Sequence, residues 1–175
     1  MKECFEKLIN TRQSCRDFND VPLEKEKVLE IVTSALLAPS ACNSQPWKVY
    51  AITSPEKVRQ TALAIGVNGH NKFLSKAKAF IAVAEKPAVL KEGVRFDRNH
   101  FVKYDIGELI AYITLKAKSI GVETCIIGMV DQQLINSALE LKEGELCNLV
   151  VALGYSDCEL RDKKRKPFEE TVTLL

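Results

Sequence analysis

The sequence has few of the residues from which metal sites and nucleophilic catalytic sites are usually built. It contains two histidines, His70 and His100, and six cysteines that are scattered without any C-x-x-C pair. A zinc site needs Cys or His ligands at short spacing, and neither histidine lies in a Ser or Cys pattern that would indicate a catalytic dyad. We therefore expect no metal site and six reduced, structural thiols.

Three common motifs are missing as well. No G-x-G-x-x-G follows a predicted strand, and the chain has neither a G-x-x-x-x-G-K-[ST] loop nor a G-x-S-x-G elbow. The first two are glycine-rich loops that cradle phosphates, and the third presents a nucleophilic serine. The sequence therefore offers no residues on which a kinase or a hydrolase of these types could depend.

Neither one sign of charge nor a long apolar run dominates the chain. It has 25 basic and 23 acidic residues, a net charge of +2, which excludes a generally basic nucleic-acid binder. No uninterrupted apolar run comes near the roughly 18 residues of a membrane-spanning helix. The first residues, 1–6, contain no apolar core of the signal-peptide kind. We expect a cytoplasmic protein with neither nucleic acid nor membrane as a partner.

What is present suits a packed globular chain. Of the 175 residues 46% are hydrophobic and 27% charged, and no repeat or linker interrupts them, so we expect one domain over residues 1–175. Short apolar runs predict strands at Trp47–Ile52, Phe80–Ala84, Glu123–Ile127 and Leu149–Leu153. Together with the helices that follow, this pattern predicts an α+β layered fold.

Apolar residues at helical spacing predict the helices and their ends. Phe5, Leu8 and Ile9 indicate a short first helix, and a second carries an apolar stripe from Val28 to Leu36. Pro22 is expected in the first turn of that second helix and Pro39 at its end. The remaining expected boundaries are Ser54 and Asp131 as helix caps, and the longest helix, Val102–Ile120, with Gly121 as its stop.

The last residues form a separate case. Thr171–Leu175 is strand-like in composition, and nothing follows it in the chain to cover its edge. Because an exposed strand edge tends to pair with another strand, we expect a partner subunit to cover this edge.

Four polar segments interrupt this apolar plan, and each allows two interpretations. Thr11–Arg16 has two arginines and a serine that could bind a phosphate, or it is a solvated turn. Pro39–Trp47 could contact the polar edge of a flat heterocycle, or only connect a helix to a strand. Gly128 could let main-chain N–H groups face a ligand, or only make a turn. The basic run Arg161–Lys166 is, taken alone, a solvated tail.

Taken together and in order, these segments resemble the nitroreductase family of FMN-dependent NAD(P)H oxidoreductases. The pattern R-x-S-x-R stands at Arg12–Arg16, and P-S-x-x-N-x-Q-P-W is matched in full at Pro39–Trp47. Gly121–Gly128 is similar to the family's G-x-x-[ST]-x-x-I-G element, and the basic Lys163–Pro167 completes the order. The resemblance covers nearly the whole chain.

The resemblance implies a layered fold with a mostly antiparallel central sheet flanked by helices. It also implies a homodimer with C-terminal strand exchange and two FMN sites at the subunit interface. The implied FMN-binding residues are Arg12, Gln13, Ser14, Arg16, Lys163 and Arg165 at the ribityl chain and phosphate, Ile127 and Gly128 near N5, and Pro39, Ser40, Asn43 and Gln45 from the other subunit. Relatives often contact the flavin ring from a segment that corresponds here to His70 and Asn71, with Phe73 where some have lysine.

The implied chemistry asks little of the side chains. NADH or NADPH would deliver hydride to flavin N5 and leave, and a small acceptor such as a nitroaromatic, quinone or enone would follow in a ping-pong cycle. We therefore name no catalytic acid or base. Two alternatives stay open: a non-catalytic FMN-binding or redox-sensing protein, and a flavin enzyme of other chemistry, such as reductive dehalogenation or flavin breakdown.

Overall fold

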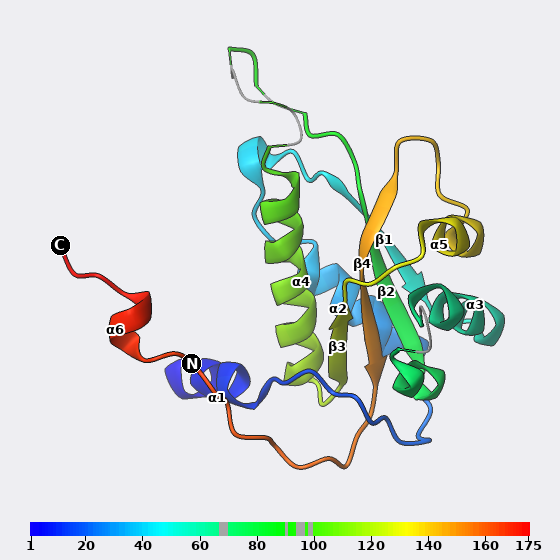
Figure 1. Cartoon of the computed structure of the whole chain (residues 1–175), viewed down its shortest axis with the longest axis horizontal. Coiled ribbons are helices and arrows are strands. Elements are labelled where there is room, and N and C mark those ends of the chain that lie inside the picture. Colours follow the sequence, from blue (N-terminus) through cyan, green and yellow to red (C-terminus); the bar gives the residue numbers. More distant parts are fainter. Residues whose placement is uncertain (67–69, 90, 94–96, 98–99) are drawn as a thin grey trace.

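The computed structural model describes residues 1–66, 70–89, 91–93, 97 and 100–175. A four-stranded sheet forms its centre (Figure 1). The strands are β1 (Trp47–Ile52), β2 (Ala79–Glu85), β3 (Glu123–Ile127) and β4 (Leu146–Gly154), in the spatial order β1-β2-β4-β3. Each neighbouring pair is antiparallel. The predicted α+β fold with a mostly antiparallel sheet is therefore confirmed.

The two central strands are apolar on both faces because helices cover both sides of the sheet. β2 is buried along almost its whole length, and so is the second half of β4. Phe80, Ile81, Val151 and Leu153 are each fully buried. Continuous apolar runs rather than alternating ones are what a strand buried on both faces requires, and these runs are what the sequence showed.

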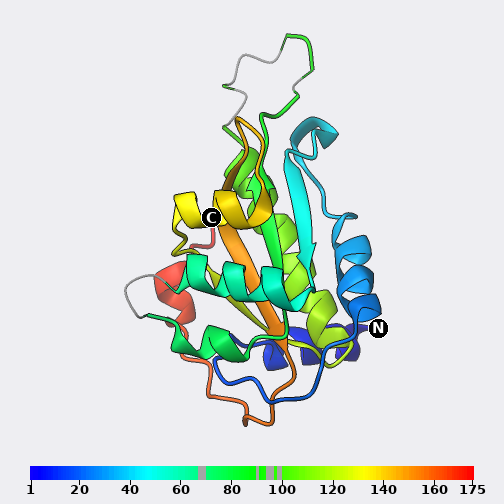
Figure 2. The ribbon, with the colours of Figure 1, turned by 90° about the vertical axis from the view of Figure 1, so that its right-hand side faces the viewer.

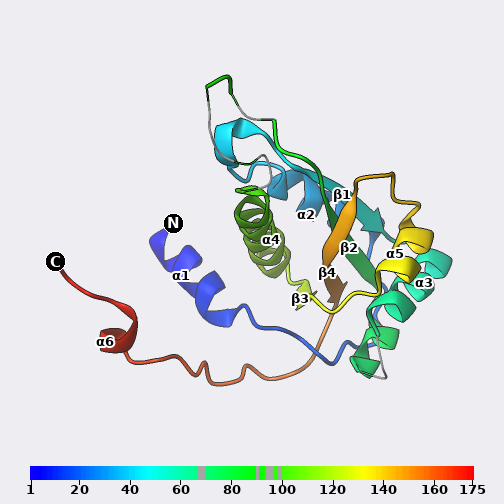
Figure 3. The same ribbon diagram turned by 45° about the horizontal axis from the view of Figure 1, so that its top comes forward.

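Helices cover both faces of the sheet (Figures 2 and 3). α2 (Lys25–Ala35) and α4 (Val102–Ser119) enclose one core with the sheet, and α4 supplies the fully buried Leu109 and Ile113. α3 (Pro55–Ile65), α5 (Gln132–Leu139) and the short helix η3 (Lys72–Lys76) enclose the other. Burying a Leu or Ile side chain contributes roughly 1.5–3 kcal/mol, so these contacts hold the layers together.

Several predicted helix boundaries hold and one does not. Asp131 caps α5, where its Oδ1 accepts hydrogen bonds from the N–H groups of Gln133 and Leu134 at 3.0 Å each. Gly121, with φ of +78°, lies just beyond the end of α4 as predicted. The prediction for Pro22 was wrong. α2 begins at Lys25, so this proline belongs to the preceding extended segment, which its fixed φ also suits.

Two cysteines that lie in apolar runs behave as small hydrophobic residues. Cys125 and Cys147 are 2% and 0% exposed, and all six cysteines have free thiols. Burial raises the pKa of the Cys147 thiol to about 11, so this thiol stays protonated at neutral pH. A protonated, buried thiol is a poor nucleophile, which agrees with a packing role.

The two chain ends lie away from the sheet. α1 (Lys2–Thr11) and α6 (Phe168–Thr171) contain no buried residue and project to one side in Figure 1. The expected strand Thr171–Leu175 is absent: Thr171 ends α6, and Val172–Leu175 has no regular structure. A strand needs a neighbouring edge to bind, and among the described residues this segment pairs with no strand. No helix in the described ranges is long and apolar enough to cross a membrane.

Candidate functional site

A cationic pocket forms where the segment after α1 meets the basic tail. The cavity has a volume of about 360 Å³. Its lining joins two stretches of the chain almost 150 residues apart, and consists of Arg12, Gln13, Ser14, Arg16, Arg161, Asp162, Lys163, Lys164 and Arg165. The structure therefore brings together all six residues that the sequence assigned to the ribityl chain and phosphate.

The first wall of this cationic pocket is held by the sheet. Ser14 pairs with Thr124 in a parallel bridge, and the N–H of Cys15 donates to the carbonyl of Thr124 at 2.8 Å. Cys15 is buried at 3% exposure. Because neighbouring side chains of an extended segment point to opposite sides, burial of Cys15 turns Ser14 and Arg16 outward toward the cavity.

The second wall is held by an arginine that the sequence prediction missed. Arg161 donates to the side-chain oxygen of Gln13 from both its backbone N–H (3.1 Å) and its Nε (3.3 Å). Its Nη2 also donates to the carbonyl of Ser14 at 2.5 Å. The Gln13 amide in turn donates to the carbonyl of Glu159 at 3.2 Å. Only the basic run could have indicated Arg161, because the family pattern marks Lys163 and Arg165 instead.

Lys163 is engaged at the end of α1. Its ammonium donates to the carbonyls of Ile9 at 2.5 Å and Arg12 at 2.8 Å, which lie where a helix leaves its last carbonyls without partners. The pKa of Lys163 lies below its ordinary value, first through desolvation and then through the neighbouring charges of Arg12 and Arg165. Both guanidinium groups therefore lie close enough to Lys163 to repel its charge.

Three guanidinium groups are left for a ligand. Among the described residues, Arg12, Arg16 and Arg165 take part in no ion pair, and Arg165 donates only to the carbonyl of Lys164 at 2.9 Å. A flavin phosphate carries nearly two negative charges and binds best to several charge-assisted donors. The donor set therefore fits the phosphate of FMN.

The loop between α2 and β1 is tightly constrained. Cys42, Asn43 and Gln45 all have positive φ, at 54°, 53° and 46°, a conformation that non-glycine residues adopt at some cost. The Ser40 hydroxyl accepts from the backbone N–H of Gln45 at 3.0 Å, and the Gln45 amide donates to Asn43 at 3.2 Å.

A buried carboxylate of α4 is hydrogen-bonded to the backbone of this loop. Asp105, only 5% exposed, accepts a hydrogen bond from the N–H of Ala41 at 3.0 Å through its Oδ1. Sequence reasoning missed Asp105, since nothing in the pattern of α4 distinguishes it from an exposed acidic residue. Asn43 and Gln45 are exposed. Pro39 lies before the residues with positive φ.

One chain does not bring this loop and the cationic pocket together. The loop, with its short helix η1 (Ala41–Asn43), lies beside the start of α4, whereas α1 and the basic tail lie beyond the other end of α4 (Figure 1). The 18 residues of α4 span roughly 27 Å. The loop residues assigned to FMN are therefore too far from the pocket of their own chain to share one flavin with it.

The residues assigned near N5 lie at the end of β3. Ile127 is buried as its last residue, and Gly128 is exposed and lines a separate cavity of about 380 Å³ with Asn148 and Leu149. A Cβ on Gly128 would meet only Leu149, at 3.7 Å. Packing therefore leaves room for a side chain at this position, and the open glycine makes the backbone accessible.

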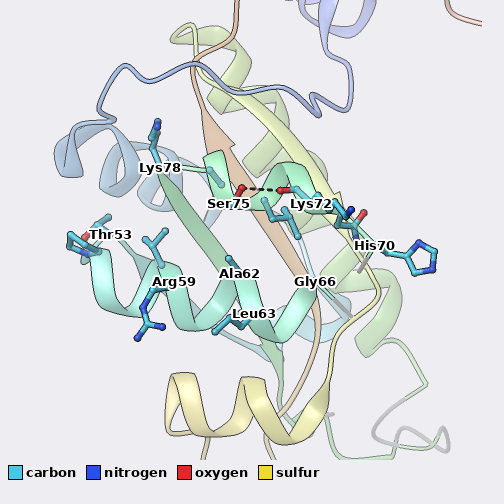
Figure 4. Close-up of a pocket in the computed structure, with 14 residues that line it drawn as sticks. Thr53, Arg59, Ala62, Leu63, Gly66, His70, Lys72, Ser75 and Lys78 are labelled. Carbon is cyan, nitrogen blue, oxygen red and sulfur yellow. Dashed lines mark hydrogen bonds between the residues drawn. The ribbon is translucent and has the colours of Figure 1, made fainter. Parts of the chain in front are cut away.

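His70 lies apart from these groups. It borders a cavity of about 510 Å³ between α3 and η3, and its ring points away from that cavity (Figure 4). Asn71 donates to the carbonyl of Ile65 at 3.4 Å, and Phe73 stacks at a tilt against Phe18 at 6.4 Å. At the position where the resemblance allowed for a lysine, this chain thus has an aromatic residue packed against its core, and the ring contacts of His70 stay a prediction.

The chain is similar in sequence to proteins of one family. A model described as the nitroreductase family matches residues 9–92 and 61–155. An Archaeoglobus fulgidus protein described as an NADH dehydrogenase/NAD(P)H nitroreductase is 28% identical over 159 residues, covering 89% of this chain and 86% of that protein.

Solved structures have the same fold. A nitroreductase family protein from Streptococcus pneumoniae gives a TM-score of 0.83 at 20% identity, covering 98% of this chain and 100% of that one. The NADPH:FMN oxidoreductase of Vibrio harveyi, solved with NAD+, gives 0.82 at 22% identity, covering 98% of this chain and 76% of that one. With most of its length matched by the family model, the chain belongs to the nitroreductase family.

Proposed function

We propose that the protein is a homodimeric, FMN-dependent oxidoreductase of the cytoplasm that takes electrons from NADH or NADPH. The observation that carries this proposal is the cationic pocket, in which Arg12, Arg16 and Arg165 have no acidic partner among the described residues. Bound FMN would supply hydride transfer through N5 to a small acceptor such as a nitroaromatic, quinone or enone, in a ping-pong cycle.

The protein's part is to bind and orient the cofactor. The three free guanidinium groups would hold the phosphate, and Ser14 would donate from its outward hydroxyl. The exposed backbone at Gly128 would face the N5 edge. A positive charge or an N–H donor near N1 and O2 would stabilise the anionic reduced ring. No acid or base is required from the side chains, so we assign no catalytic residue.

The separation of the Pro39–Gln45 loop from the pocket favours a dimer. If the loop contacts a flavin, that flavin belongs to the partner subunit, because α4 separates the loop from its own pocket. Large apolar residues at both chain ends are exposed, and a partner would cover them. They are Phe5 at 56%, Ile9 at 44%, Phe168 at 61% and Leu174 at 86%.

The C-terminal strand exchange has a suitable acceptor in β1. β1 is the outermost strand on its side of the sheet, and β3 on the other side is already bridged by Ser14. Val172–Leu175 of one subunit would add as a strand to the outer edge of the partner's β1. Deleting residues 169–175 should therefore lower both dimer content, measured by sedimentation, and flavin occupancy, measured by absorbance.

A direct test uses the purified protein. We expect a yellow protein with the absorbance of FMN at about one flavin per chain, bleached rapidly by NADH or NADPH in anaerobic stopped flow. A colourless protein that takes up no FMN at micromolar concentration would refute the proposal. Flavin that is bound but inert to both nucleotides would refute the enzymatic part and leave a binding or sensing protein.

A further inference from the structure

The basic tail reaches the cationic pocket against electrostatic repulsion. Six cationic side chains line this pocket, and the only carboxylate among the described residues that line it is Asp162. Without a bound anion these like charges repel one another. Every residue from Asp157 onward is exposed, so burial of apolar side chains does not hold the tail in place.

Few contacts tie the tail to the body of the protein near the pocket. Between Glu159 and Arg165, the hydrogen bonds that the described residues show to the body are those of Glu159, Arg161 and Lys163. Four of them join Gln13 or Ser14 to Glu159 or Arg161. The Gln13 amide is used on both sides, since its oxygen accepts twice from Arg161 and its nitrogen donates to Glu159.

We propose that Gln13 and Arg161 form a latch, the Gln13–Arg161 latch, that positions Arg165 opposite Arg12 and Arg16 before the flavin phosphate binds. This inference rests on the proposed function and assigns these two residues to positioning instead of direct cofactor contact. The Arg161 guanidinium donates hydrogen bonds to Gln13 and Ser14. These bonds hold the tail against the body of the protein. A pocket arranged in advance binds its ligand more tightly, because less freedom is lost on binding.

The latch makes a prediction that a direct phosphate contact does not. Gln13→Ala removes no charge, yet it breaks the side-chain hydrogen bond that Arg161→Ala also breaks, from Arg161 Nε to the Gln13 side-chain oxygen. It also breaks the bonds of the Gln13 amide to the backbone N–H of Arg161 and to the carbonyl of Glu159. Each variant should weaken FMN binding by about tenfold, the effect of losing one or two such hydrogen bonds. The double variant should lose less affinity than the product of the two single losses, because the two residues share one of the hydrogen bonds that hold the tail. Lys166→Ala removes one charge from the same tail outside the cavity and should change affinity less than about twofold.

Two measurements test the latch. Fluorescence titration with FMN gives the affinities of wild type and of the four variants. Hydrogen exchange by mass spectrometry on flavin-free protein reports the amides of residues 159–165. Faster exchange there in both Gln13→Ala and Arg161→Ala, together with the non-additive affinity loss, supports the latch. Wild-type FMN affinity in Gln13→Ala, losses that multiply in the double variant, or unchanged exchange would overturn it. If wild-type protein binds no FMN, the proposed function fails, while the exchange data still decide whether the latch exists.

Discussion

The layered core and the cationic pocket are built on opposite principles. In the core, Leu109, Ile113 and Leu153 are 0% exposed, and contacts between apolar side chains hold the elements in place. In the pocket, six cations share a small volume with one acidic residue among the described lining, and hydrogen bonds from an exposed tail hold them there. Apolar contacts hold the core, whereas the pocket depends on a bound anion to offset its charge or on hydrogen bonds to hold the tail against the repulsion.

The largest expected effect breaks the core and spares the pocket. Leu109→Ala, on the buried face of α4, should lower the free energy of unfolding by about 2–5 kcal/mol, because it leaves a cavity between α4 and the sheet. Urea denaturation at fixed protein concentration measures this loss. Leu63→Ala is the control, since Leu63 is 61% exposed and should cost less than about 0.5 kcal/mol. Equal losses in the two variants would contradict the assigned core.

The next effect breaks the pocket and spares the core. Arg12→Ala leaves the flavin phosphate short of one charged donor and should cost about 1.5–3 kcal/mol of FMN binding free energy, roughly one to two decades in Kd. Urea denaturation without flavin should change little. Riboflavin lacks the phosphate, so its weaker affinity should barely respond. If FMN and riboflavin lose affinity equally, Arg12 acts through packing and the phosphate assignment is wrong.

A third variant acts on the boundary between the two regions. A Cβ on Gly154, at the end of β4, would lie 2.8 Å from Cδ1 of Phe18. Phe18 is 1% exposed, so it has little room to move, and overpacking should cost about 1–3 kcal/mol of unfolding free energy. Because Phe18 anchors the chain just after Arg16, FMN affinity should fall as well. Gly107→Ala has no atom within 4 Å of its new Cβ and should lower neither quantity.

The same contrast explains what the sequence could predict. The four strands and the long helix follow from local apolar patterns, and β1 and β3 agree with the structure at both ends. Arg161 and Asp105 were missed because their roles depend on long-range partners, Gln13 and Ala41, that no local pattern reveals. The expected strand at Thr171–Leu175 failed for a related reason, since a strand forms only on a paired edge and the local apolar pattern does not show whether the tail reaches one.

The smallest effect separates two helix caps that looked alike in the sequence. Asp131 accepts from two N–H groups of α5 at 3.0 Å, whereas Ser54, at the start of α3, makes no side-chain cap hydrogen bond. Asp131→Ala should therefore cost about 1 kcal/mol of unfolding free energy, within the usual range of roughly 0.5–2 kcal/mol for a lost cap. Ser54→Ala should lower the unfolding free energy by only about a few tenths of a kcal/mol, since Pro55 already sets the first turn of α3. Urea denaturation of both variants beside wild type resolves the difference. If Ser54→Ala loses as much as Asp131→Ala, the serine caps α3 in solution. The start of α3 would then depend on its side chain as much as the start of α5 does.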